Sequence, residues 1–154
     1  MQSLHFEAAA FWCIVPVYSQ QIVVSNVTIY ARTEHGGGTP NTDGIEPMWT
    51  TDVHVHDVKI DNGDDCITIK SGSSDILIED LDCTHSHGIT IGSIWYDDVR
   101  NVTYRNCRLH GLSAGPRIKG RMQGNATVSD IHFVNIVLDG VKEAIQVIKN
   151  AIID

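Results

Sequence analysis

This chain of 154 residues has no stretch in which apolar residues recur convincingly at helical spacing, and it contains few leucines. The first absence argues against amphipathic helices. The second argues against a leucine-rich repeat, which needs a leucine-rich signature. No segment approaches the roughly 20 apolar residues that a membrane-spanning helix requires. We therefore expect a fold built from strands, with no membrane partner.

Basic residues are also scarce, since 11 Lys and Arg stand against 19 Asp and Glu, which gives a net charge of −8 at pH 7. A chain without a basic stripe is not expected to bind nucleic acid. The whole-molecule field would also repel a polyanionic ligand, so attraction must come from local cations. Eight histidines begin to charge at mildly acidic pH and would ease this repulsion.

The four cysteines lack the paired spacing and the partner histidines of a zinc site. The acidic segment Asp61–Asp65 lacks the alternating ligands and distant Glu of an EF-hand loop. We therefore predict no metal site and no cofactor.

One short pattern occurs five times along the chain. In each copy, apolar residues lie four and two positions before an Asn or Asp and one and three positions after it. Apolar residues two apart indicate a strand with one buried face. The phase changes at the Asn or Asp, which predicts a bend into a second short strand, because these residues tolerate unusual φ angles. The markers are Asn26, Asp57, Asp80, Asn106 and Asn135.

A further short strand follows in most copies. These strands are predicted at Ile67–Ile69, at Ile89–Ile91, around Ile118 and at Ile145–Val147. A β-sandwich is the alternative, but sandwiches have no reason to repeat a sequence coil after coil. The predicted fold is all-β, a right-handed parallel β-helix of about five coils forming one domain over residues 1–154.

Four polar clusters are spaced by roughly one coil, so stacked coils about 4.8 Å apart would bring them together. Three carboxylates, an imidazole, a guanidinium and an ammonium would then line one groove. Splitting a glycosidic bond needs an acid for the leaving oxygen and a base for water, and paired cations suit a uronic acid. An isolated Asp-Asp pair would more often be an acidic turn. The clusters are Asn41–Gly44, Gly63–Asp65, Ser86–Gly88 and Arg117–Lys119.

In this order the clusters resemble those of the polygalacturonase family, the pectin-degrading glycoside hydrolases of family 28, over about residues 11–148. The resemblance implies hydrolysis with inversion of the anomeric centre. It implies that Asp64 is the acid and that Asp43 and Asp65 hold the attacking water. It also implies a catalytic role for His87, and substrate binding by the three residues Asn41, Arg117 and Lys119.

The chain departs from the family in three respects. Ser86 replaces the first glycine of a Gly-His-Gly motif, and its Cβ would narrow the groove or alter the turn beside His87. A family tyrosine further along has no counterpart here. Family members are generally more than twice as long, and neither end of this chain has the pattern expected of a solenoid cap. We therefore expect a domain truncated at both ends.

Similar family members join the cysteine after the double Asp to one shortly before the catalytic His, here Cys66 and Cys83. Such a bridge would stabilise the fold by about 3 kcal/mol on chain-entropy grounds. Cys83 also occupies an apolar repeat column and would fit as a simple core residue. A bridge favours an oxidising, extracellular setting, although no basic residue precedes the apolar segment at residues 8–19, as a signal peptide would require.

Two functional classes remain open at this point. The first is an enzyme that hydrolyses the α-1,4-galacturonan backbone of pectin, with a rhamnogalacturonan hydrolase as its nearest rival. The second is an inactive β-helix that binds polysaccharide. In either class the expected partner is a pectic polysaccharide, and no obligate protein partner is predicted. The sequence does not distinguish endo from exo cleavage.

Overall fold

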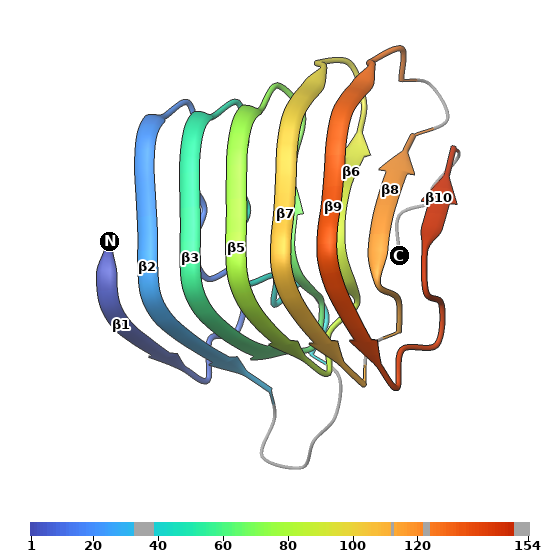
Figure 1. The fold of residues 1–154 in the computed structure, drawn as a ribbon. Coiled ribbons are helices and arrows are strands. Elements are labelled where there is room, and N and C mark those ends of the chain that lie inside the picture. Colours follow the sequence, from blue (N-terminus) through green and yellow to red (C-terminus); the bar gives the residue numbers. More distant parts are fainter. Residues whose placement is uncertain (33–38, 112, 122–123, 150–154) are drawn as a thin grey trace.

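The computed structural model describes residues 1–32, 39–111, 113–121 and 124–149. Its strands coil around one axis, so that a long curved sheet and a shorter sheet enclose a single core (Figure 1). Every strand pairing within the two sheets is parallel. The long sheet contains, in spatial order, β1 (Gln2–Glu7), β2 (Gln20–Ala31), β3 (Thr51–Asn62), β5 (Ser74–Thr84), β7 (Val99–His110) and β9 (Val128–Asp139).

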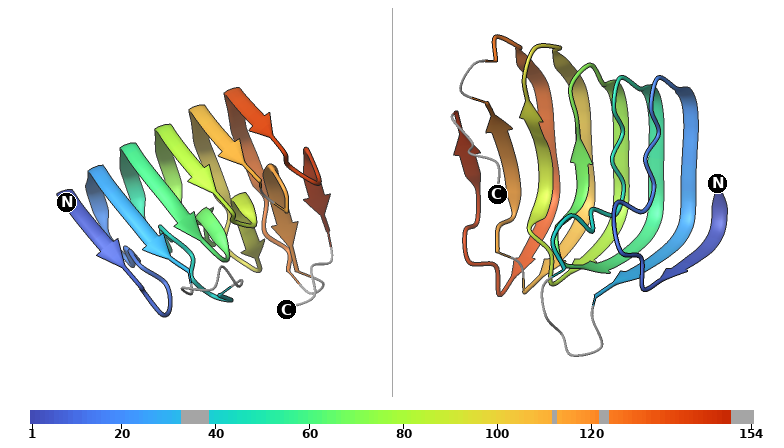
Figure 2. Two further views of the ribbon diagram at one scale, coloured as in Figure 1. Left: turned by 90° about the horizontal axis from the view of Figure 1, so that it is seen from below. Right: turned by 180° about the vertical axis from the view of Figure 1, so that it is seen from behind.

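The shorter sheet follows the same coil order. Isolated parallel bridges join Ile14 to Ile45 and Ile45 to Ile67, and they continue this sheet across the earlier coils. The two views in Figure 2 show successive coils side by side along the axis. The strands of the shorter sheet are β4 (Asp65–Ile69), β6 (Gly88–Ile94), β8 (Pro116–Gly120) and β10 (Gln146–Ile148).

The repeat columns of the sequence coincide with the strand register. Val24 pairs with Val55, which pairs with Ile78, which pairs with Tyr104. All four side chains are buried, and they form one of the apolar stacks of the core. The predicted right-handed parallel β-helix, with about five coils, is confirmed.

The five markers all adopt left-handed backbone conformations, with φ between 51° and 55°. They stack at one corner, where Asn135 Nδ2 donates to Asn106 Oδ1 at 2.8 Å. Each long strand continues through this bend, which corrects the expectation of two separate strands. A left-handed residue also lies five positions before each marker, and this second bend was not predicted. These residues are Gln21, Asp52, Asp75, Asn101 and Asp130.

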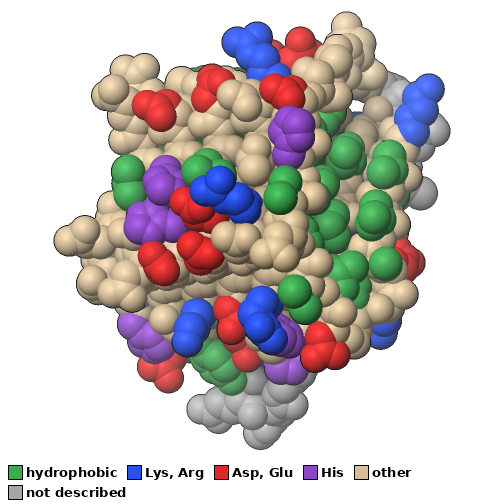
Figure 3. Space-filling model, viewed as in Figure 1, with side chains coloured by type: hydrophobic (Ala, Val, Ile, Leu, Met, Phe, Trp, Pro, Cys, Tyr) green, Lys and Arg blue, Asp and Glu red, His purple; other side chains and the backbone are tan. Residues whose placement is uncertain are grey.

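The two ends of the coil stack differ from its middle. β1 pairs with β2, although the repeat pattern did not reveal this strand. Apolar side chains gather at the opposite end, over β9 and β10 (Figure 3). Val134, Val137 and Ile145 are exposed there, because no described strand packs on the outer edge of β9. Among the described residues, no helix is long and apolar enough to cross a membrane.

Candidate active site

A bulge at the start of β4 turns the buried Asp65 side chain toward Arg117 and Lys119. Asp65 pairs with Gly88 and Ile67 pairs with Ile89, so two residue steps on β4 lie opposite one residue step on β6. The extra residue, Cys66, points into the core and is fully buried. A bulge changes the direction of neighbouring side chains. Asp65 can therefore face Arg117 and Lys119 while Cys66 and Ile67 both lie in the core.

The backbone of Gly63 lies very close to the backbone of Thr39, which comes earlier in the chain. A Cβ at this position would lie 2.3 Å from Thr39 N and 2.6 Å from Thr39 O. Glycine is therefore required by this close approach and not by a left-handed φ, since the φ of Gly63 is outside that region. The Gly63 N–H also donates to Thr42 Oγ1 at 3.0 Å.

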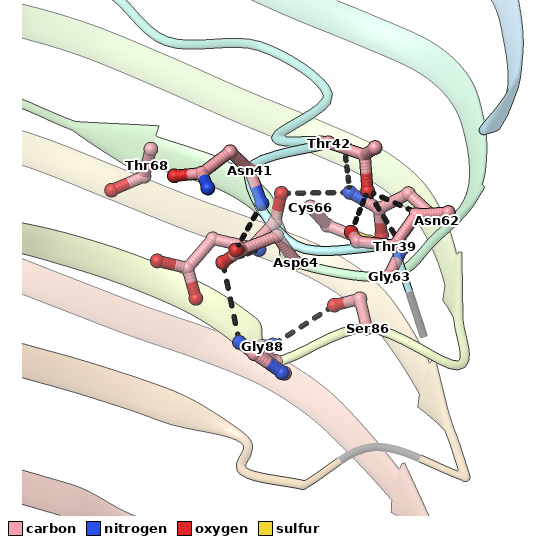
Figure 4. Close-up of polar contacts among 12 residues, drawn as sticks. Thr39, Asn41, Thr42, Asn62, Gly63, Asp64, Cys66, Thr68, Ser86 and Gly88 are labelled. Carbon is pink, nitrogen blue, oxygen red and sulfur yellow. Dashed lines mark hydrogen bonds and ion pairs between the residues drawn. The ribbon is translucent and has the colours of Figure 1, made fainter. Parts of the chain in front are cut away.

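Asn62 links the two segments that carry the carboxylates. Its buried side-chain amide donates to Thr42 O at 2.7 Å and to Asp65 O at 2.9 Å. These bonds fix the segment before Asp43 against the segment that carries Asp64 and Asp65 (Figure 4). The sequence reasoning missed this positioning role of Asn62. The only available signal was an Asn directly before the acidic turn.

The burial of Asp43 gives it an unusual protonation. Burial is the main cause that raises its pKa from 3.8 to about 8, and the charges of Asp64, Asp65 and Glu46 add to this, against Lys70. Three crowded carboxyl groups cannot all ionise. In this structure the group that keeps its proton at neutral pH is Asp43.

Asp64 behaves in the opposite way. Burial raises its pKa, but hydrogen bonds from His87 and from the N–H groups of Asn41 and Asp65 outweigh burial and lower the pKa to about 2. Asn41 N lies 2.8 Å from Oδ2, and Asp65 N lies 2.8 Å from Oδ1. Three donors therefore stabilise the carboxylate form of Asp64 in the unliganded protein, and the assignment of Asp64 as the acid stays a prediction.

His87 reaches Asp64 from the next coil. Its Nδ1 lies 3.2 Å from Asp64 Oδ1, and its backbone N–H donates to Asp64 O at 2.9 Å. The hydrogen bond to Asp64 raises the pKa of His87 against the opposing effect of burial. At mildly acidic pH the pair therefore consists of an imidazolium and a carboxylate.

Ser86 does not enter the groove. Its side chain is buried, and Ser86 Oγ accepts a hydrogen bond from Gly88 N at 2.9 Å. The same oxygen lies 3.2 Å from Cys83 Sγ. Of the two effects expected of Ser86, a narrower groove or an altered turn, the structure shows only an effect on the turn, because the buried hydroxyl bonds within the turn that carries His87.

Arg117 and Lys119 both project from β8 toward Asp65. Arg117 Nη1 lies 3.1 Å from Asp65 Oδ1, and Lys119 Nζ lies 3.0 Å from Asp65 Oδ2. Ile118, between them, packs against the core, so the alternation of a strand places both cations on the groove side. Arg117 also donates to His87 O at 3.0 Å. The two cations thus hold both oxygens of one buried carboxylate.

The structure joins Cys66 and Cys83 by a disulfide, with 6.3 Å between their Cα atoms. The bridge connects the start of β4, next to Asp65, to the end of β5, three residues before Ser86. Both cysteines are also fully buried, so the bridged residues are core residues as well. The bridge fixes two of the segments that carry candidate site residues.

The side chains of Asp64, Asp65 and His87 place one potential ligand atom each within 4.8 Å of one another, an arrangement that could hold a cation. Asp65 already binds two cationic side chains, and His87 gains positive charge at mildly acidic pH. A metal ion would have to compete with these charges. The donor set therefore fits proton transfer better than metal binding.

The structure also adds residues that the sequence reasoning did not single out. Glu46 is fully buried beside Asp43, and Lys70 Nζ lies 3.5 Å from its Oε2. Glu46 lies two residues after the Asn41–Gly44 cluster, but no repeat column marks it as buried. Its position depends on the packing of the neighbouring coils, which the sequence pattern does not reveal.

A family model described as glycosyl hydrolases family 28 matches residues 1–151. The chain is 35% identical over 149 residues to a polygalacturonase of Medicago sativa, covering 93% of this chain and 33% of that protein. It is 33% identical over 117 residues to a probable rhamnogalacturonase B of Aspergillus fumigatus, covering 75% and 22%. A solved structure of a hyperthermoactive exopolygalacturonase from Thermotoga maritima matches with a TM-score of 0.88 and 28% identity, covering 96% and 35%.

The parallel β-helix and the family match lead to the same class of protein. The chain belongs to glycosyl hydrolases family 28. It spans about a third of the length of the Medicago sativa polygalacturonase that it matches.

Proposed function

We propose that this protein hydrolyses the α-1,4-galacturonan backbone of pectin with inversion of the anomeric centre. The observation that carries the proposal is the convergence of Arg117 and Lys119 on Asp65, next to the Asp64–His87 pair. This arrangement combines a clamp for a carboxylate with groups that can give and accept protons. A pectic polysaccharide is the proposed substrate.

Substrate binding begins at the two cations. A uronate carboxylate would compete with Asp65 for Arg117 and Lys119, since a guanidinium and an ammonium both bind carboxylates. The side chains of both cations are mostly buried, which strengthens their attraction for an anion. Substrate that draws these cations away from Asp65 would free the oxygens of Asp65 to accept a proton from water.

Proton delivery involves Asp64 and His87 together. In the unliganded protein at mildly acidic pH, His87 holds the proton of this pair and Asp64 is ionised. Substrate that covers the pair removes water, which favours the neutral forms of both groups. The proton then moves from Nδ1 to Asp64 Oδ1 over the 3.2 Å contact. Asp64 can pass it to the leaving glycosidic oxygen, as acid catalysis requires.

Water is held by the other two carboxyl groups. Asp43 keeps its proton at neutral pH and can therefore donate a hydrogen bond or accept one. Asp65 supplies the carboxylate that takes a proton from the attacking water. In this assignment Asp43 orients the water and Asp65 acts as the base.

The test is the release of reducing ends from polygalacturonate by this chain at mildly acidic pH. Hydrolysis predicts new reducing ends without an unsaturated product that absorbs ultraviolet light. An unsaturated product would identify a lyase, and binding without any cleavage would identify an inactive polysaccharide-binding β-helix. Either result would overturn the proposal. The Cys66–Cys83 bridge supports an extracellular location as part of the same proposal.

A rhamnogalacturonan hydrolase is the second candidate. The similarity to a probable rhamnogalacturonase B favours it. Comparing reducing-end release from polygalacturonate and from rhamnogalacturonan, at equal concentrations of sugar, separates the two candidates. Faster cleavage of rhamnogalacturonan would make the second candidate the better one.

A further inference from the structure

Three Asn-x-Ser/Thr sequences, in which x is not proline, lie outside the candidate active site. Such a sequence accepts an N-linked oligosaccharide in a protein that passes through a eukaryotic secretory pathway. The side chains of all three asparagines are exposed, so exposure alone does not decide which of them is modified. The three sequences are Asn26–Thr28, Asn101–Thr103 and Asn125–Thr127.

Asn26 and Asn101 already use the side-chain nitrogen that would carry the sugar. Asn26 Nδ2 donates to Ser3 Oγ at 3.1 Å, and Asn101 Nδ2 donates to Asp75 Oδ1 at 2.8 Å. Both asparagines lie in left-handed bends, with φ of 51° and 52°, and each bond joins one coil to the coil before it. An oligosaccharide on either nitrogen would have to share that nitrogen with a bond between coils that stack about 4.8 Å apart.

The same two sequences are built into the long sheet. Val27 is 1% exposed and Val102 is fully buried, so the middle residue of each sequence packs in the core. Neighbouring strands pair with both sides of Val27 and of Val102. Enzymes that modify a chain reach flexible, exposed segments. The backbone of these two sequences is therefore withdrawn from such an enzyme as soon as its coil forms.

Asn125 has different surroundings, in the connection between β8 and β9. The third sequence precedes β9, which begins at Val128. Among the residues that the structure describes, none forms a hydrogen bond with the Asn125 side chain, and the φ of Asn125 is outside the left-handed region. A sugar on the Asn125 nitrogen would therefore break no contact with a described residue.

Contacts hold this connection on both sides of Asn125. The Thr127 N–H donates to Asp98 Oδ1 at 2.7 Å. A Cβ at Gly124 would lie 2.2 Å from Trp95 O, so glycine allows the two backbones to pack closely there. The Thr127 side chain, whose hydroxyl is the second half of the acceptor sequence, is exposed like that of Asn125. The fold thus presents the acceptor amide and the hydroxyl together at the surface.

We propose that Asn125 is an N-glycosylation site of this protein and that Asn26 and Asn101 stay unmodified. The donor is an oligosaccharide carried on a lipid diphosphate. The bond between sugar C1 and the diphosphate oxygen breaks, C1 bonds to Asn125 Nδ2, the amide gives up one proton, and the lipid diphosphate leaves with the electron pair. This inference rests on the extracellular location within the proposed function and not on the activity.

The test is peptide mapping by mass spectrometry of the chain secreted from a eukaryotic host behind a cleavable signal peptide. Removal of N-glycans with peptide N-glycosidase converts the asparagine that carried the glycan to aspartate. We expect this conversion at Asn125 and unchanged asparagine at Asn26 and Asn101. Because the oligosaccharide is added on entry to the secretory pathway, chain retained in the cells is mapped in the same way.

Variants remove one acceptor sequence at a time. Asn125→Gln and Thr127→Ala should each lose the whole glycan, while Thr127→Ser, which keeps the hydroxyl, should retain it. Thr28→Ala and Thr103→Ala are the matched controls, because they remove the other two acceptor sequences and leave the bend asparagines in place. Both controls should keep the glycan of the parent chain. Melting temperatures show whether each variant is folded.

Asparagine that stays unconverted at position 125, or a glycan on Asn26 or Asn101, would overturn this inference. Release of reducing ends from polygalacturonate is measured on the same preparations. It should be equal in the parent chain and in Asn125→Gln, because Asn125 is not one of the candidate active-site residues. Cleavage without a glycan would overturn this inference alone, and a glycan without cleavage would overturn only the proposed function.

Discussion

His87 Nδ1 lies 3.2 Å from Asp64 Oδ1 on the preceding coil, and this contact changes the proton affinity of both side chains. The pKa of His87 rises because Asp64 stabilises the imidazolium. The pKa of Asp64 falls to about 2, because donors that include His87 outweigh the effect of burial. The two residues therefore share one proton and should be studied as a pair.

Replacing His87 by Gln keeps a hydrogen-bond donor but removes the transferable proton. We expect kcat/KM on polygalacturonate to fall and the alkaline limb of its pH profile to change, because that limb reports the loss of the His87 proton in the free enzyme. Steady-state kinetics across the acidic, neutral and mildly alkaline range measure this. His132→Gln, on β9, is the control and should keep the original profile. An unchanged profile in His87→Gln would show that His87 stores no catalytic proton.

Replacing Arg117 or Lys119 by Ala should weaken binding of galacturonate oligomers. Each variant loses a charge-assisted bond of about 1.5–3 kcal/mol, which corresponds to roughly 10- to 150-fold in Kd. Turnover should also slow if this contact tightens in the transition state. Lys59→Ala removes an exposed cation from the long sheet and serves as the control. Calorimetry that finds Arg117→Ala and Lys59→Ala equivalent would contradict the role of the clamp.

Asp43 should make stability depend on pH. Its pKa is 3.8 as a free side chain and about 8 in the folded protein. Between these values the folded state holds a proton that the unfolded state has lost, so the free energy of unfolding should fall as pH rises through this window. Asp43→Asn should flatten the slope. Thermal melts across this window measure it, with the exposed Asp57→Asn as the control that keeps the slope.

A slope that is the same in the unmodified chain and in Asp43→Asn would show that Asp43 is not the source. Asp64 should act in the opposite direction, because its folded pKa is about 2 and its ordinary pKa is 3.8. Its contribution to stability is present above about pH 4 and is lost as the pH falls toward about 2.

Removing the disulfide should lower the free energy of unfolding by about 3 kcal/mol, the chain-entropy value for a loop of this length. Denaturant unfolding of the Cys66→Ala/Cys83→Ala double variant measures the loss. A reducing agent should destabilise the unmodified chain and have no further effect on the double variant. Equal sensitivity of both proteins to the reducing agent would show that the bridge is not the stabilising element.

The strands and their stacking could be predicted from the sequence, because one buried face per strand imposes a period of two and each coil repeats the same environment. Asn26 and the four other markers fixed the corner, since Asn and Asp accept a left-handed φ. The strand β1 was not predicted, because its residues do not repeat the full pattern.

Less of the candidate site than of the fold could be predicted from the sequence. The order of the clusters indicated which residues converge, but the bulge after Asp65 and the packing of Thr39 on Gly63 depend on contacts between coils. Protonation depends on the same contacts. Asp43 and Asp64 are both aspartates near a turn, and their different burial, hydrogen-bond donors and neighbouring charges separate their pKa values.

The most direct measurement of the central claim is the kcat of polygalacturonate hydrolysis for Asp43→Asn, Asp64→Asn and Asp65→Asn. We predict that Asp64→Asn lowers kcat by roughly 10² to 10⁴, the value of a positioned acid, while substrate binding stays nearly intact, because the amide keeps the shape of the carboxyl. Normal kcat in Asp64→Asn with loss in either of the other variants would place the acid on another carboxyl. Three silent variants in a protein that still cleaves pectin would show that this column is structural.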